Sequence, residues 1–197
     1  MPVNRWFSNA RVQVPKPALH PTNVPPSLWI LRFLPLVPRG GRVLDLAAGG
    51  GRHTALLRER GYRVLAVDRD TSVLARRFAG EAAVEIRSLD LEDGGPWRLG
   101  EGFDGIVVTN YFHRSLFAPM IDALAPGGAV LYETFMLGNE RFGRPSNPDF
   151  LLRPGELLAV FGSELTVVAF EQGIVDEPRP AAVQRIAAVK GPSGILP

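Results

Sequence analysis

The chain has 197 residues, of which 46% are hydrophobic and 21% charged, and its formal net charge is +2. That length fits one domain, and that composition is typical of a soluble globular protein, so disorder, collagen and coiled coil are excluded. The sequence contains no cysteine, which excludes a disulfide framework, a thiolate zinc site and cysteine nucleophiles and fits a reducing cytoplasm.

The first 40 residues are rich in proline, which lacks an amide donor and fixes φ, so long regular elements are not expected there. Only residues 27–34 have the pattern of a short helix, which Pro35 ends. The apolar side chains of this helix predict that residues 1–40 form an N-terminal arm that docks on the main body.

After Gly41, short β-rich runs alternate with helical ones, a pattern typical of a doubly wound α/β domain. The predicted strands are residues 42–46, 63–68, 83–87, 103–109 and 128–134. The predicted helices begin near Gly51, at Asp70 or Thr71, at Ser115 as the capping residue, and near Pro154.

The end of the chain has a different pattern. Residues 164–170 and 182–189 are β-rich with no long helix between them, which predicts an antiparallel pair at one sheet edge. The main domain is therefore expected to span residues 41–190, followed by a tail of residues 191–197.

The strongest motif is VLDLAAGGGRHT at residues 43–54. A strand that contains Asp45 runs into a loop of small residues, and a helix opens after it, so backbone amides and the positive helix end face a ligand above the strand tips. The small residues Ala47, Gly49, Gly50 and Gly51 allow that ligand to lie against the backbone. By itself, such a loop also fits a tight turn.

Three residues narrow the class of ligand. A nicotinamide fingerprint would place a third glycine where this sequence has Thr54, and the carboxylate of Asp45 suits an ammonium or sulfonium group better than a pyrophosphate. Asp68 ends the next strand, where an acid can accept hydrogen bonds from ribose hydroxyls. Its alternative role is to cap the following helix.

Five segments then come in a recognisable order: VLDLAAGGGRHT, VLAVDRD, SLDLED, FDGIVVTNYFHR and LAPGGAVLYETF. Over residues 41–190 the chain resembles the class I S-adenosylmethionine-dependent methyltransferases. The resemblance implies a Rossmann-like α/β fold, a doubly wound seven-stranded sheet of order 3-2-1-4-5-7-6 with strand 7 antiparallel. The glycine loop looks most like that of small-molecule methyltransferases such as the tellurite- and thiol-methylating branch.

The same resemblance implies an enzyme with S-adenosylmethionine as its cofactor. Asp45 and the loop from Ala47 to Gly51 would lie near the methionine part, Asp68 at the ribose, Asp90 and Leu91 at the adenine, and Asn110 near the reacting end. The implied cofactor-binding residues are Asp45, Ala47, Gly49, Gly50, Gly51, Asp68, Arg69, Asp90, Leu91 and Asn110.

The acceptor pocket is expected after strands 4 and 5. Methyl transfer from a sulfonium is an in-line displacement that needs alignment and exclusion of water, so no catalytic triad is predicted and no catalytic residue is assigned. Tyr111 or Phe112 can contact the sulfonium through a ring face, and His113 can take a proton. Glu133 ends the next strand. The alternatives are aromatic packing, a surface histidine, and an ion pair from Glu133 to Arg141 or Arg144.

Residues 136–153 are long for a strand-to-helix connection and carry aromatic and arginine side chains. We expect them to cover the acceptor pocket as a lid, together with the helix at residues 27–34. In this lid, Arg141 or Arg144 would pair with an anionic substrate group and Phe142 would form an apolar wall. The alternative is a structural loop that pins strand 5 to the final antiparallel pair.

The expected partner is a small-molecule acceptor. No run is long enough to span a membrane, the arginines are scattered among acids, and the separated histidines do not suggest a metal site. Three alternatives remain: a nicotinamide oxidoreductase, a nucleic-acid or protein methyltransferase, and a non-catalytic scaffold. The run Thr109 to Phe112 lacks both prolines of the Asn/Asp-Pro-Pro-Tyr loop, which disfavours amide and base N-methylation.

Overall fold

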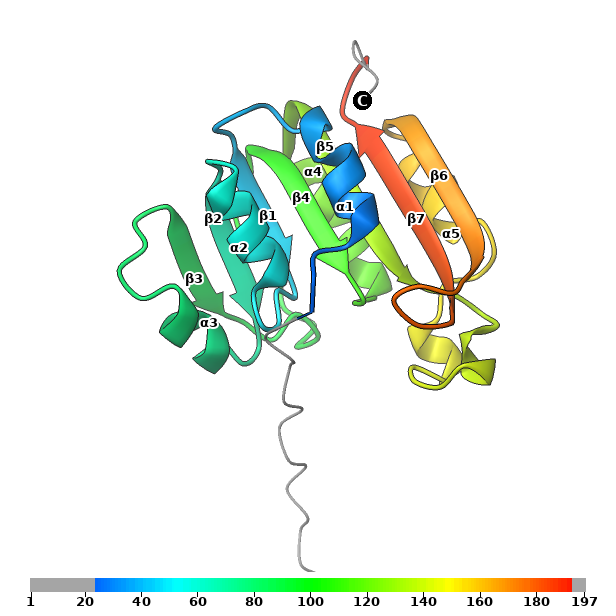
Figure 1. Cartoon of the computed structure of the whole chain (residues 1–197). Helices are drawn as coiled ribbons and strands as arrows, with labels where there is room; N and C mark the ends of the chain where they lie inside the picture. Colours follow the sequence, from blue (N-terminus) through cyan, green and yellow to red (C-terminus); the bar gives the residue numbers. More distant parts are fainter. Residues whose placement is uncertain (1–23, 193–197) are drawn as a thin grey trace, which may run out of the picture.

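The computed structural model describes residues 24–192, so residues 1–23 of the expected arm and residues 193–197 of the tail lie outside the described residues. The described part forms a seven-stranded sheet of order β3-β2-β1-β4-β5-β7-β6 (Figure 1). The strands are β1 (Arg42–Leu46), β2 (Arg63–Asp68), β3 (Val84–Ser88), β4 (Phe103–Thr109), β5 (Leu124–Phe135), β6 (Thr166–Val175) and β7 (Ala181–Val189). The predicted order is confirmed.

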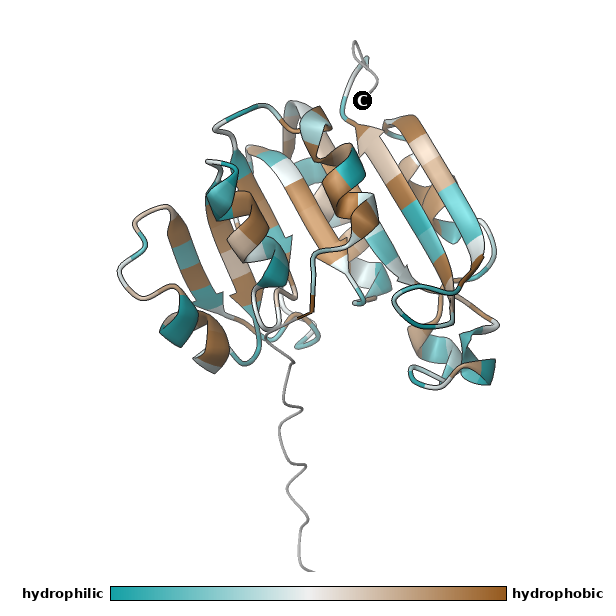
Figure 2. Cartoon of the chain, viewed as in Figure 1, coloured by the Kyte–Doolittle hydropathy of each residue, from teal (hydrophilic) through white to brown (hydrophobic). Residues whose placement is uncertain are grey.

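Six strands, β1 to β6, run in the same direction, and β7 is antiparallel to its neighbours β5 and β6. The central strands are brown in Figure 2 because their side chains are apolar on both faces. In β1, for example, Val43 packs on one face and Leu44 on the other, and both are fully buried. Continuous apolar runs of this kind are what a parallel sheet covered on both faces requires.

The helices cover the two faces of the sheet. They are α1 (Leu28–Phe33), α2 (Arg52–Glu59), α3 (Ser72–Arg77), α4 (Phe117–Ala123) and α5 (Glu156–Phe161). One hydrophobic cluster contains side chains of α1, α2 and α3, and a second contains those of α4 and α5, so the first three helices lie on one face and the last two on the other (Figure 1). Within residues 24–192, no helix is both long and apolar enough to cross a membrane.

The helix expected in the arm, α1, packs on the face of the sheet. Ser27 caps it by accepting hydrogen bonds from the amides of Trp29 (3.1 Å) and Ile30 (3.4 Å). The indole of Trp29 is buried and donates to the carbonyl oxygen of Ile186 in β7 at 3.2 Å. The helix is therefore not a lid over the strand tips, which is where the sequence analysis placed it, because its apolar side chains are used against the sheet.

The connection at residues 136–153 is folded and anchored. It contains two short 3-10 turns, Asn139–Arg141 and Pro148–Phe150. The side chain of Asn139 accepts from the amide of Ala182 in β7 (3.2 Å) and donates to the carbonyl of Pro145 (2.9 Å). Because Met136 also pairs with Leu152, both ends of the segment are pinned next to β5 and β7.

Candidate active site

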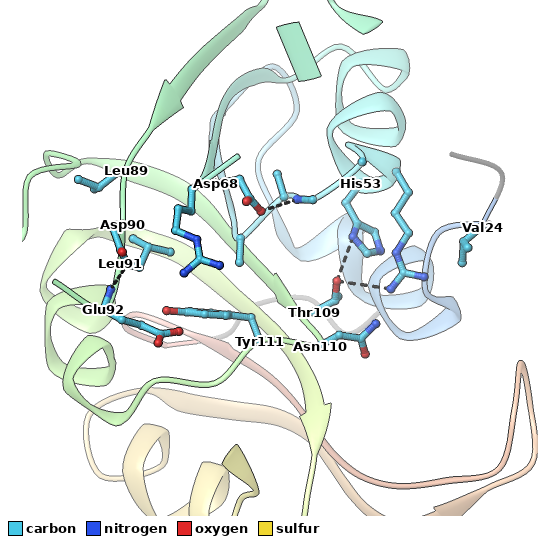
Figure 3. Close-up of a pocket in the computed structure, with 16 residues that line it drawn as sticks. Val24, His53, Asp68, Leu89, Asp90, Leu91, Glu92, Thr109, Asn110 and Tyr111 are labelled. Atoms are coloured by element: carbon cyan, nitrogen blue, oxygen red, sulfur yellow. Dashed lines mark hydrogen bonds between the residues drawn. The ribbon is translucent and has the colours of Figure 1, made fainter. Parts of the chain in front are cut away.

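A cavity of about 430 Å³ lies at the carboxyl ends of β1, β2 and β4 (Figure 3). Its walls come from residues 47–50, 52, 53, 68, 69, 89–92 and 109–111, together with Val24. Ligands of open α/β sheets bind at this edge, where the strand order reverses between neighbouring strands. The cavity is therefore the candidate site.

The loop between β1 and α2 forms one wall and depends on its small residues. Ala47 and Gly49 both have positive φ, of 56° and 55°, which turns the backbone toward the cavity. Gly51 lies behind this wall at φ 74°, and a Cβ there would come within 2.6 Å of Phe78 and 2.7 Å of Leu74. Gly51 is thus required for the approach of α3 and does not itself line the cavity.

Asp68 joins the tip of β2 to this loop. One of its carboxylate oxygens accepts the amide hydrogen of Gly49 at 2.8 Å, and the other accepts from the amide of Asp70 at 3.1 Å. Figure 3 shows the carboxylate beside the loop and on the cavity wall. The acid therefore sets the shape of the loop and keeps lone pairs for a ligand.

The wall opposite the glycine loop comes from the segment after β3 and from Tyr111. Asp90 accepts the amide hydrogen of Glu92 at 3.0 Å, which fixes a turn along the cavity. Tyr111 is half-buried, and burial, followed by the carboxylates of Glu92 and Asp90, raises the pKa of its phenol well above the usual value. The phenol therefore stays neutral at physiological pH.

Arg52, His53 and Thr109 form a hydrogen-bonded group that the sequence analysis did not single out. His53 Nε2 accepts from the amide of Ser27 (3.1 Å), and its Nδ1 lies 3.2 Å from the hydroxyl oxygen of Thr109. Because Nε2 accepts, Nδ1 carries the proton and donates to Thr109. Burial, with a smaller effect of Arg52, lowers the pKa of His53 to about 3, so the ring is neutral.

Arg52 contacts the same two parts of the chain as His53, the segment before α1 and the end of β4. Its guanidinium donates to the carbonyl of Pro25 (3.1 Å) and lies 3.5 Å from the hydroxyl of Thr109. Both Arg52 and His53 line the cavity. Figure 3 shows the ring of His53 pointing toward Thr109, so the first turn of α2 connects the segment before α1 to the tip of β4. Arg52 thereby places a positive charge next to the glycine loop.

Two further cavities adjoin the first at Asn110. The second, of about 460 Å³, and the third, of about 230 Å³, both include Asn110 among their walls. Asn110 has a positive φ of 56°, and its amide donates to the carbonyl of Glu133 at 2.9 Å, which turns the chain sharply at the end of β4. The three hollows therefore meet at one residue.

This geometry agrees with the sequence family. Residues 44–132 match the family described as "Methyltransferase domain", and the sheet has the strand order that the resemblance implied. Residues 44–132 therefore form a methyltransferase domain, and the sheet has the fold of the class I S-adenosylmethionine-dependent methyltransferases. A methyltransferase domain of this fold indicates S-adenosylmethionine as the ligand to test in the first cavity.

The curated relatives of this chain are named for different kinds of substrate. It is 34% identical over 152 residues to "Ribosomal RNA small subunit methyltransferase H" of Gemmatimonas aurantiaca, covering 73% of this chain and 44% of that one. It is 32% identical to "Protein-L-isoaspartate O-methyltransferase" of Chromobacterium violaceum, covering 58% of this chain and 54% of that one. The chain thus spans about half the length of the curated relatives it matches.

Solved structures show the same methyltransferase fold. TehB from Haemophilus influenzae superposes with a TM-score of 0.66 at 19% identity, covering 79% of this chain and 59% of that one. The Burkholderia thailandensis 1,6-didemethyltoxoflavin-N1-methyltransferase, solved with S-adenosylhomocysteine, gives 0.60 at 22% identity, covering 83% and 76%. At these identities the likeness establishes the fold alone.

The site residues expected from sequence separate into two groups. Nine of the cofactor and pocket residues line the first cavity: Ala47, Gly49, Gly50, Asp68, Arg69, Asp90, Leu91, Asn110 and Tyr111. Asp45, Gly51, His113, Glu133, Arg141 and Phe142 are not among the residues that line any of the three cavities.

Side-chain contacts explain why the second group lies elsewhere. Glu133 pairs with Arg185 of β7 at 2.6 Å, instead of with Arg141 or Arg144. Arg141 folds back over the ring of Phe142, with the guanidinium carbon 5.5 Å from the ring centroid, and both side chains are exposed.

Asp45 lies at the end of β1, before the glycine loop, and is not among the residues that line the first cavity. Its side chain is buried, with a relative exposure of 2%, and its carboxylate accepts the hydroxyl hydrogen of Thr54 at 2.6 Å. Burial is the main cause that raises the pKa of Asp45 to about 6. The residue therefore supports the loop through α2, and its expected place near the methionine part stays a prediction.

We expect the Asp45→Asn variant to remove a pH dependence from stability. The folded-state pKa of about 6 exceeds the ordinary value of 3.8, so the folded protein loses stability as pH rises from about 4 through 6. The loss is on the order of 3 kcal/mol, because one pKa unit corresponds to about 1.4 kcal/mol. Asparagine cannot ionise, and its side-chain oxygen still accepts a hydrogen bond from Thr54. In urea unfolding between pH 4 and 7.5, the free energy of unfolding of the variant should therefore rise relative to that of the wild type as the pH rises. The prediction would be wrong if the free energies of unfolding of variant and wild type changed in parallel with pH, or if Asp122→Asn, at an exposed acid, gave the same relative rise.

Proposed function

We propose that this methyltransferase transfers the methyl group of S-adenosylmethionine to a small-molecule acceptor. The observation that carries the proposal is the meeting of three cavities at Asn110. The first has the features of a nucleoside site, and the other two, of about 460 and 230 Å³, share Asn110 with it. A cofactor and a small acceptor can therefore lie on either side of one residue.

The walls of the first cavity fit the parts of S-adenosylmethionine. In our proposal Asp68 accepts hydrogen bonds from the ribose hydroxyls, with Arg69 beside it, and Asp90 and Leu91 contact the adenine. The backbone of Ala47, Gly49 and Gly50 holds the methionine part. The guanidinium of Arg52 supplies a cation for its carboxylate, as guanidinium groups do for carboxylates generally.

The bound cofactor supplies an electrophilic methyl group on a sulfonium, and the residues of the chain supply position. In-line displacement needs reacting atoms about 3 to 3.5 Å apart and water excluded, and no covalent intermediate is required. Tyr111 lines both the first and the third cavity, so its ring separates the two ligands and offers a π face to a cation. Because its phenol stays neutral, it can donate a hydrogen bond but does not act as a base.

A macromolecular acceptor is the second candidate, because the curated relatives are named for ribosomal RNA and protein substrates. The cavities beyond Asn110, of about 460 and 230 Å³, favour the small acceptor because their volumes suit a small molecule. We also propose a cytoplasmic location and no membrane partner, in keeping with a sequence free of cysteine.

Methyl-labelled S-adenosylmethionine distinguishes these candidates. The purified chain would be incubated with pools of thiols, phenols and amines, and separately with ribosomal subunits and an isoaspartyl peptide, and the label followed by mass spectrometry. We expect labelled product and S-adenosylhomocysteine in a small-molecule pool, and loss of both with Asp68→Ala. Label found only in RNA or peptide would assign a macromolecular acceptor, and no label in any pool would contradict methyl transfer.

A further inference from the structure

The second cavity carries an unbalanced positive charge. Arg144, from the segment after β5, and Arg179, from the turn between β6 and β7, both line it, and no carboxylate does. Within residues 24–192, neither arginine forms an ion pair. Two guanidinium groups with no opposing acid attract an anion, and each can bind a carboxylate through two hydrogen bonds.

Two phenylalanines also line this cavity, alongside Asn110 and residues 145–147. Phe135, at the end of β5, is 7% exposed, and Phe150 is 51% exposed. The guanidinium carbon of Arg179 lies 5.9 Å from the centroid of the Phe135 ring, so charge and ring face are adjacent. An exposed phenylalanine beside a hollow offers apolar area that a flat ligand would cover.

The segment that carries Arg144 is held in place without a ligand. Its neighbour Pro145 accepts a hydrogen bond from the side chain of Asn139, which also binds the amide of Ala182 in β7. At the far end of the segment Leu151 is fully buried. A cavity wall fixed at both ends binds with a smaller entropic cost than a mobile loop would.

Resting on the proposed function, we propose that the methyl acceptor is an aromatic carboxylate. Its carboxylate would pair with Arg144 and Arg179, and its ring would lie against Phe135 and Phe150. The end to be methylated would then point toward Asn110, which the second cavity shares with the first. Arg144 and Phe150 thus take the roles that the sequence analysis gave to Arg141 or Arg144 and to Phe142.

Binding measurements with matched probes test this proposal without turnover. In saturating S-adenosylhomocysteine, calorimetry would compare hydroxy- and aminobenzoates with the corresponding neutral benzamides. We expect at least one carboxylate to bind at least about tenfold tighter than its amide, because only the carboxylate can pair with the two arginines. The acid and its amide are otherwise closely matched, so the comparison isolates the charge. The Arg144→Ala/Arg179→Ala variant should lose this preference, whereas Arg141→Ala, on the same segment but outside the cavities, should keep it. Phe150→Ala should weaken acid and amide alike.

The outcomes separate this inference from the function on which it rests. If S-adenosylhomocysteine binds normally but no carboxylate exceeds its amide, or if Arg141→Ala abolishes the preference equally, the acceptor assignment is overturned. If S-adenosylhomocysteine itself does not bind the wild type, the proposed methyltransferase function is wrong, and the acceptor assignment that rests on it is wrong as well. Unchanged S-adenosylhomocysteine affinity in the double variant shows that the cofactor cavity has stayed intact.

Discussion

The Asp68→Ala variant is expected to bind S-adenosylhomocysteine about 10- to 150-fold more weakly than the wild type, since hydrogen bonds to a charged group contribute about 1.5 to 3 kcal/mol. Two effects act together. The carboxylate is lost as an acceptor for the ribose, and the amide of Gly49 loses the partner that holds the loop at 2.8 Å. The fold should survive, because the side chain lies on the cavity wall and not in the hydrophobic core.

Calorimetry with S-adenosylhomocysteine measures this effect, and circular dichroism checks the fold. Asp122→Ala is the matched control, because Asp122 is an exposed acid on α4 and does not line the cavities. Its affinity should equal that of the wild type. An unchanged dissociation constant in well-folded Asp68→Ala would remove Asp68 from the cofactor site.

The Gly51→Ala variant is expected to lose about 2 to 5 kcal/mol of stability, the sum of a left-handed backbone cost of about 1 to 2 kcal/mol and an overpacking cost of about 1 to 3 kcal/mol. The new methyl group would lie 2.6 Å from a ring carbon of Phe78 and 2.7 Å from a methyl of Leu74. Both side chains are buried, so they have little room to withdraw.

Gly80→Ala isolates the backbone cost, because Gly80 has a φ of 79° with nothing within 4 Å of the added Cβ. In urea unfolding, the free energy of unfolding of Gly80→Ala should be about 1 to 2 kcal/mol lower than that of the wild type, and that of Gly51→Ala should be lower still. Equal losses in the two variants would mean that Phe78 and Leu74 yield without cost and that the loop tolerates a side chain.

Most of the sheet was predictable from sequence because its strands are buried on both faces. Residues 42–46, 63–68 and 103–109 agree with β1, β2 and β4 at both ends. By contrast, β5 begins at Leu124, four residues before the predicted start at Gly128, because tertiary pairing overrides a Pro-Gly-Gly sequence. In that pairing the amide of Gly127 donates to the carbonyl of Lys190 at 2.7 Å.

Capping was less predictable than strand position. The helix α4 begins at Phe117 after a 3-10 turn, Arg114–Leu116, so Ser115 lies inside that turn instead of capping the helix. The side chain that does cap α1 is Ser27, whose amide also donates to His53. That second contact joins residues 26 positions apart and has no local sequence signal.

Some residues of the candidate site could likewise be predicted from the local sequence, and others could not. Asp68 and the glycine loop follow strands directly, so their positions at the strand tips could be predicted from local pattern. The contact between His53 and Thr109 spans 56 residues and becomes visible only in the fold. Similarly, an irregular segment has no periodicity from which to tell that Arg144 faces a cavity and Arg141 does not.

Calorimetric titration of the wild type with S-adenosylmethionine, S-adenosylhomocysteine and NAD tests most directly whether the first cavity holds S-adenosylmethionine. Three acids (Asp68, Asp90 and Glu92) and two arginines line the cavity, so its lining carries a net negative charge, which suits a sulfonium cation better than a pyrophosphate. We predict saturable binding of both S-adenosyl compounds and binding of NAD at least about tenfold weaker, a difference of about 1.4 kcal/mol or more. Tighter binding of NAD than of either S-adenosyl compound would contradict the account.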